Sequence, residues 1–188
     1  MAIKIFIDQG HNPVNPNAGA EAFGVREQDV NYDIGVRLAT LLNANPNFEA
    51  RLSRNSPTEQ LGTSTLTSLQ ARTDMANSWG ADYFISIHAN ASPNPNIRGS
   101  EAYVFSVNSP AYELANRILE FLHYMTLLPT LGVFERPSLF VLRNTNMPAV
   151  LVETGYLTNP IDNNLLVTDP QSFARGIYLG ILSYFGLL

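Results

Sequence analysis

A single carboxylate stands directly after a buried-looking apolar run near the end of the chain. Residues 149–152 read AVLV, and Glu153 follows them, with Thr and Gly next. A short, continuous apolar run is typical of a strand that is buried on both faces. Burying an unpaired carboxylate costs roughly several kcal/mol. We therefore expect Glu153 either to reach solvent in a turn or to meet a cation or a proton.

Two histidines and a second glutamate occupy comparable positions. His11 follows an expected strand over residues 2–8, and His88 ends an expected strand over residues 83–87. Glu27 begins an expected helix. The carboxyl ends of parallel strands meet at one edge of a sheet, so these side chains are expected together with Glu153.

Each of these residues also has a simpler structural interpretation. His11 would be a solvated or turn-stabilising residue, and His88 a hydrogen-bonded core histidine. Glu27 would be a charge favoured at a helix start, and Glu153 an exposed turn carboxylate. The shared position at one predicted edge favours a common role over four separate ones.

That common role is metal binding with proton transfer. Two imidazoles and a carboxylate suit Zn²⁺ and leave one position open for water. A further carboxylate near that water can accept and return protons. Glu21 is an alternative to Glu27 on these grounds. The remaining histidine, His123, falls inside an expected helix away from this edge, and we interpret it as structural.

The elements that position these residues alternate along the chain. We expect helices over 27–44, 68–79, 110–126 and about 170–185, with a short helical piece from residue 159, and Gly80 as a helix cap. We expect strands over 2–8, 48–54, 83–87, 99–105, 138–143 and from 149, and assign no structure to 127–137. This order predicts an α/β fold, a single domain over residues 1–188 with a mainly parallel twisted sheet of about six strands and helices on both faces. The strand over 99–105 is expected to run antiparallel at an edge.

Composition limits the classes of function. The chain has 188 residues, of which 45% are hydrophobic and 14% charged, which is typical of a globular domain. Its net charge of −5 argues against nucleic acid as a partner. Without cysteine, the chain has no disulfide or zinc-thiolate site. Its longest apolar stretch, 176–188, is too short to span a bilayer, and we recognise no signal peptide at its start.

Four segments resemble the zinc-dependent N-acetylmuramoyl-L-alanine amidases, the cell-wall hydrolases of bacteria and their phages. The segments are IFIDQGH (5–11), REQDVNYDIGVRLATLL (26–42), SIHANAS (86–92) and LFVLRNTNMPAVLVETGYLTNPID (139–162). LSRNS and ARTDMAN (71–77) are also similar to family sequence. The resemblance covers nearly the whole chain, and its last segment is the most specific.

The resemblance implies a site and a reaction. It implies Zn²⁺ bound by His11, Glu27 and His88, with Glu153 as the catalytic acid and base, and so favours Glu27 over Glu21. The implied substrate is peptidoglycan, cut at the amide between N-acetylmuramic acid and L-alanine of the stem peptide. It also implies action at the cell wall, outside the cell or in the periplasm, by a phage-type enzyme or a domain of a longer protein.

The chain departs from the family pattern in two places. Its first loop reads GHNPVNPNAGA, where the family more often has GHGG and an Asp. The stretch LLPTLGVFERP (127–137) replaces one that contains Arg-Gly, and here we expect a different substrate groove. Asn90 and Arg143 are candidates for substrate contact, or else turn and surface residues. Two alternative functions are a zinc peptidase acting within the stem peptide and an inactive wall-binding module of the same fold.

Overall fold

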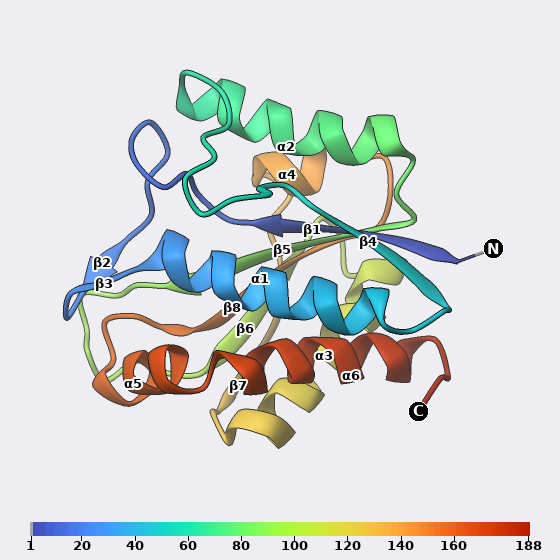
Figure 1. The fold of residues 1–188 in the computed structure, drawn as a ribbon. Helices are drawn as coiled ribbons and strands as arrows, with labels where there is room; N and C mark the ends of the chain where they lie inside the picture. The colour runs from blue at the N-terminus through green and yellow to red at the C-terminus, as the bar shows by residue number, and fades with distance from the viewer. Residues whose placement is uncertain (1) are drawn as a thin grey trace.

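The computed structural model describes residues 2–188, which form a six-stranded sheet, a two-stranded sheet and six helices (Figure 1). The strands are β1 (Ile3–Gln9), β2 (Glu21–Ala22), β3 (Val25–Arg26), β4 (Phe48–Leu52), β5 (Tyr83–Asn90), β6 (Ser100–Val104), β7 (Thr130–Glu135) and β8 (Ala149–Tyr156). The helices are α1 (Glu27–Asn43), α2 (Thr65–Trp79), α3 (Pro110–Thr126), α4 (Phe140–Arg143), α5 (Pro160–Thr168) and α6 (Pro170–Tyr184).

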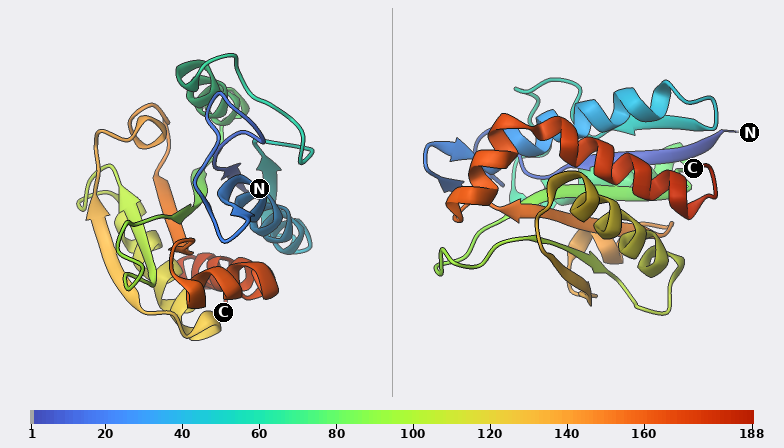
Figure 2. Two further views of the ribbon diagram at one scale, coloured as in Figure 1. Left: turned by 90° about the vertical axis from the view of Figure 1, so that its left-hand side faces the viewer. Right: turned by 90° about the horizontal axis from the view of Figure 1, so that it is seen from below.

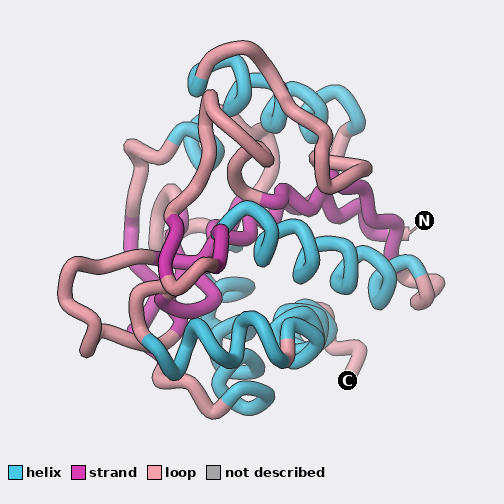
Figure 3. The backbone as a smooth tube through the Cα atoms, turned by 60° about the vertical axis from the view of Figure 1, so that its left-hand side comes forward, coloured by secondary structure: helices cyan, strands magenta, loops and turns pink. Residues whose placement is uncertain are grey.

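The large sheet is mainly parallel, and the predicted α/β fold is confirmed. Its strands lie in the order β4-β1-β5-β8-β6-β7. The first four are parallel to one another, whereas β6 runs antiparallel to β8 and β7 runs parallel to β6. The carboxyl ends of β1, β5 and β8 therefore meet at one edge. The loops that follow β1 and β5 extend from that edge (Figures 1 and 3).

Helices cover both faces of the sheet, as predicted (Figure 2). Alternation along β8 explains the two cores, because successive side chains of a strand point to opposite faces. Val150 and Val152 pack into the larger core, with apolar residues of α1, α3 and α6. Leu151 packs into the smaller core, with apolar residues of α2 and α4. Glu153, two residues further on, shares the face of Leu151.

The strand predicted over residues 138–143 is wrong, because Phe140–Arg143 form the short helix α4. A short apolar run fits a buried strand and a buried helix equally well. Here β8 is already hydrogen-bonded on both sides, by β5 and β6. The segment instead covers the sheet, and Val141 and Leu142 pack into the smaller core.

The unassigned stretch contains an edge strand. β7 pairs with β6 and lies outside it, so β6 is antiparallel to β8 as predicted but is not at the edge. Four of the six residues of β7 are exposed, which explains why no clear pattern of burial marked the strand. The helix predicted over 68–79 begins earlier, at Thr65, because Ser64 and Thr67 form a capping box.

Two further observations complete the fold. Gly80 ends α2 in the left-handed conformation, with φ of 66°, as expected of a helix cap. Within residues 2–188, no helix combines the length and the hydropathy needed to cross a membrane.

Candidate active site

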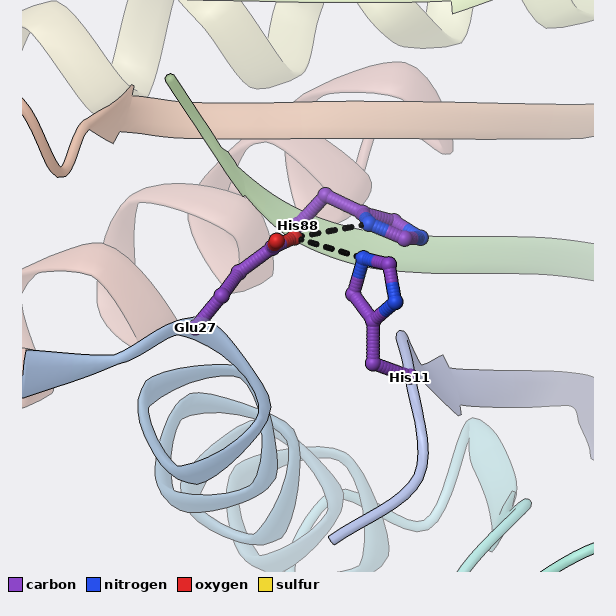
Figure 4. Close-up of side chains that lie close together, drawn as sticks. All are labelled: His11, Glu27 and His88. Atoms are coloured by element: carbon purple, nitrogen blue, oxygen red, sulfur yellow. Dashed lines mark hydrogen bonds and ion pairs between the residues drawn. The ribbon is translucent and has the colours of Figure 1, made fainter. Parts of the chain in front are cut away.

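Three side chains from different elements converge near the carboxyl end of β5 (Figure 4). His11 lies two residues after β1, His88 belongs to β5, and Glu27 is the first residue of α1. The close-up shows the Glu27 carboxylate directed at both imidazole rings. Parallel pairing of β1 with β5 brings the two histidines to the same edge of the sheet.

The donor atoms of these residues face one small volume. Glu27 Oε1 lies 3.1 Å from His11 Nε2 and 3.0 Å from His88 Nδ1. The two imidazole rings are 4.8 Å apart between centroids, and their planes are inclined by 79°. One ligand atom from each of the three residues lies within 4.8 Å of the other two.

Glu27 is held in place by several donors besides the histidines. Its Oε2 accepts a hydrogen bond from the backbone N–H of Ala20 at 2.9 Å. Its Oε1 accepts from Asn31 Nδ2 and from the backbone N–H of Ala89, each at 3.3 Å. Burial alone would raise the pKa of Glu27, but hydrogen bonds and charge from the two histidines lower it below its usual range. Glu27 is therefore an ionised, rigid ligand candidate.

The geometry and chemistry of this donor set fit a zinc ion. Ligands at about 2.0–2.2 Å from Zn²⁺ in a tetrahedral arrangement lie about 3.3–3.6 Å from one another. The separations of 3.0 and 3.1 Å around Glu27 Oε1 are close to that value. Imidazole nitrogen and carboxylate oxygen are common zinc donors, and three protein ligands leave a fourth position open. His11, Glu27 and His88 can therefore hold one Zn²⁺.

Two glycines leave the space that these side chains occupy. A Cβ atom placed on Gly10 would lie 2.4 Å from the His88 ring. One placed on Gly19 would lie 2.7 Å from the Glu27 carboxylate and 2.9 Å from His11. Any larger residue at either position would therefore displace a member of the cluster.

Glu153 lies on the neighbouring strand, in register with His88. Glu153 was placed directly after its apolar strand, and this placement was wrong, because β8 continues through Glu153 to Tyr156. The Oε2 atom of Glu153 is buried and has no hydrogen-bond partner among residues 2–188. Burial, followed by the nearby charges of Glu27 and Glu101, raises the pKa of Glu153 well above its usual value. A carboxyl group with a raised pKa is suited to carrying a proton.

A cavity of about 140 Å³ adjoins the cluster on the α2 and α4 side of the sheet. Its lining includes both histidines of the cluster together with Leu139, Phe140 and Leu151. A larger cavity of about 550 Å³ lies beside β4, where Trp79 is part of its wall. The converging donor atoms, and not cavity size, identify the smaller one as part of the candidate site.

A buried ion pair supports the loop that carries His11. Arg72 Nη1 donates to Asp8 Oδ1 and to the Gln9 carbonyl, both at 2.6 Å, and Arg72 Nη2 donates to the His11 carbonyl at 2.5 Å. Burial opposes ionisation of Asp8, but the charge and hydrogen bond of Arg72 lower the pKa of Asp8. His11 has a φ of 71°, which is unfavourable for a residue with a Cβ atom. Arg72 therefore helps to hold the strained backbone at His11 in place.

Replacing Arg72 by Met is expected to reduce the free energy of unfolding by about 3–5 kcal/mol, because it leaves the Asp8 carboxylate buried without its cation. Urea unfolding of the two proteins measures this difference. Arg117→Met is the matched control. Arg117 lies on the exposed surface of α3 beside Glu113 and Glu120, where such pairs contribute about 0–1 kcal/mol. Equal losses in the two variants would contradict a supporting role for Arg72.

Other residues singled out from the sequence lie outside the cluster. Glu21 is exposed on β2 and pairs with Arg26, so it is not an alternative to Glu27 in this fold. His123 is within hydrogen-bond distance of the Leu128 carbonyl at 2.7 Å, which agrees with the structural interpretation. Arg143 is exposed and lines a separate cavity near the start of β8.

Sequence reasoning assigned no role to Asp8, Arg72 or Glu101. Asp8 and Arg72 stand in the family-like segments IFIDQGH and ARTDMAN, and a charged residue in an otherwise apolar strand was the available signal. Glu101 is buried on β6, in register with Glu153. Asn90, which stays a candidate for substrate contact, donates to Glu101 Oε1 at 2.7 Å.

The same arrangement of elements occurs in known proteins. The chain is 36% identical over 189 residues to N-acetylmuramoyl-L-alanine amidase LytC of Bacillus subtilis, an alignment that covers 96% of this chain and 35% of LytC. It is 35% identical to N-acetylmuramoyl-L-alanine amidase CwlM of Bacillus licheniformis, covering 98% of this chain and 70% of CwlM. The catalytic domain of the amidase CwlV of Bacillus (Paenibacillus) polymyxa has a similar structure, with a TM-score of 0.86, 29% identity and 99% coverage of both chains.

A family model described as N-acetylmuramoyl-L-alanine amidase matches residues 5–183. This range includes every strand of the large sheet apart from the first residues of β1, and all four side chains of the candidate site. Fold, sequence and site therefore agree, and the chain belongs to the N-acetylmuramoyl-L-alanine amidase family.

Proposed function

We propose that residues 1–188 form a single catalytic domain that hydrolyses the amide between N-acetylmuramic acid and L-alanine of the peptidoglycan stem peptide. In this proposal His11, Glu27 and His88 bind Zn²⁺, and Glu153 transfers protons. The partner is peptidoglycan, and the place of action is the cell wall. The names of the relatives support this choice of substrate. The chain spans about a third of LytC, or 35% of its length.

One observation carries the proposal. Donor atoms of His11, Glu27 and His88 lie within 4.8 Å of one another, at the strand edge where Glu153 stands in register with His88. A zinc site of two histidines and one carboxylate, with a separate proton-transferring carboxylate, is suited to hydrolysis of an amide.

Each group then has a distinct task. When bound, Zn²⁺ supplies a Lewis acid that polarises a carbonyl and lowers the pKa of water to about 7. The Glu153 carboxylate accepts the proton of the attacking water as the new C–O bond forms. The same carboxyl group then returns that proton to the amide nitrogen as the C–N bond breaks. Glu153 lies on β8, which is hydrogen-bonded to β5 on one side and to β6 on the other. This support limits the movement of the Glu153 side chain.

Product analysis separates this reaction from the alternatives. Digestion of isolated cell walls with the zinc-loaded protein should expose new amino termini of L-alanine and leave the glycan strands intact. New amino termini from other stem-peptide residues would instead identify a zinc peptidase. Binding to walls with no new amino termini would identify a wall-binding module, and either result would overturn the proposal.

A further inference from the structure

Three acidic or imidazole side chains form a row across neighbouring strands on the site face of the sheet. His88 of β5 is in register with Glu153 of β8, and Glu153 is in register with Glu101 of β6. Glu101 is only 8% exposed. A buried glutamate needs hydrogen-bond donors to offset the loss of its hydration. The residues that donate hydrogen bonds to Glu101 show which strands it connects.

Two donors to Glu101 come from the strand ends that carry the candidate site. Glu101 Oε1 accepts a hydrogen bond from Asn90 Nδ2 and another from the Tyr156 hydroxyl, each at 2.7 Å. Asn90 lies two residues after His88 on β5, and Tyr156 lies three residues after Glu153 on β8. One carboxylate oxygen on a third strand, β6, therefore joins the ends of β5 and β8, the strands that carry His88 and Glu153.

The strand ends joined in this way are irregular. The pairing of β5 with β8 shifts register between His88 and Asn90, so that Asn90 lies opposite Tyr156. The extra residue on β8 therefore falls between Glu153 and Tyr156. Such irregularities bend a strand and redirect its side chains. Their shape needs support from outside the ladder, which here includes the bond from Thr154 Oγ1 to the His88 carbonyl at 2.8 Å.

We propose that Glu101 is a positioning residue, whose carboxylate holds the shifted ends of β5 and β8 together and so fixes the direction of the Glu153 side chain. The inference rests on the proposed function, in which Glu153 moves the proton. It assigns Glu101 the role of a double hydrogen-bond acceptor. A glutamine Oε1 can accept the same two bonds. The negative charge of Glu101 is the smallest of the three causes that raise the pKa of Glu153, so its loss in glutamine should change kcat little.

The test compares Glu101→Leu with Glu101→Gln on a soluble N-acetylmuramoyl peptide. Loss of the acceptor in the Leu variant should lower kcat by about 10–100-fold, with KM within about threefold and full zinc content. The Gln variant should keep kcat within about threefold of the parent. Glu113→Leu and Glu113→Gln, on the exposed face of α3, make the same changes away from the site and should alter neither constant.

The two donors provide a second, independent measurement. Tyr156→Phe removes one hydroxyl and should lower kcat by a smaller factor than Glu101→Leu. In the double variant Glu101→Leu/Tyr156→Phe, kcat should fall by much less than the product of the two single fold-losses, because both changes remove the same contact. This series still reports on the contact if Glu101→Leu is poorly folded, since Tyr156→Phe can be compared with Glu101→Gln.

Two results would overturn the inference. Equal loss of kcat in the Gln and Leu variants would assign the effect to charge, and parent-like kcat in the Leu variant would remove the effect altogether. Failure of the proposed function is distinguishable, because it would leave the parent itself without amidase activity. In that case amide hydrogen exchange at Leu157 tests whether Glu101 holds the two strand ends together. The N–H of Leu157 donates to the Asn90 carbonyl. Exchange should be faster in the Leu variant and unchanged in the Gln variant.

Discussion

Glu153→Gln is expected to lower kcat by about 10²–10⁴-fold, the usual contribution of a general acid and base. Glutamine has nearly the same shape as glutamate but neither accepts nor releases a proton at this position. Zinc content should be unchanged, since Glu153 is separate from the three converging donors. Amidase activity on isolated walls, with zinc measured in the same preparations, checks both parts of the expectation.

The stability of this variant distinguishes a catalytic from a structural effect. Oε2 of Glu153 is buried without a hydrogen-bond partner in the part of the chain that the structure describes. Replacing a group that is costly to ionise should leave Tm unchanged or raise it, as is common for functional residues. Glu120→Gln, on the exposed surface of α3, is the matched control for both measurements. Parent-like activity of Glu153→Gln would overturn the proposed mechanism.

Removal of the zinc ligands is expected to have an effect of similar size. His11→Ala and His88→Ala should each lose stoichiometric zinc. Each should also lower the rate of hydrolysis by at least about 10³-fold, because a bound metal supplies several kcal/mol of charge stabilisation. Chelation of zinc from the parent protein should produce the same loss, and added Zn²⁺ should reverse it. Metal analysis of dialysed protein and wall digestion measure the two effects.

The third histidine of the chain is a matched control for these variants. His123 lies on α3 and contacts the Leu128 carbonyl, away from the cluster. His123→Ala should retain zinc and activity, with a modest loss of stability from the lost contact. Full zinc content in both His11→Ala and His88→Ala would show that the ligand set is wrong.

Much of the fold follows from local sequence patterns. Apolar runs predicted the buried strands β1, β5 and β8, and helical spacing predicted α1 and α3, because these elements bury long, regular faces. An Asp-Pro start and an apolar stretch predicted α6. Patterns failed where burial is partial or the run is short. β7 is mostly exposed at an edge, and α4 has only four residues, so neither carries a distinctive period.

The sequence by itself determined which residue types stand at the strand ends. Because parallel strands end at one edge, it also predicted that His11, Glu27 and His88 would meet, and the structure brings them together. Tertiary structure decided what local patterns do not encode. Glu21 is turned away on a small hairpin, while register between strands places Glu101 beside Glu153. Register depends on hydrogen bonds between residues far apart in the chain, which is why the buried contacts of Glu101, like those of Arg72, were visible only in the folded protein.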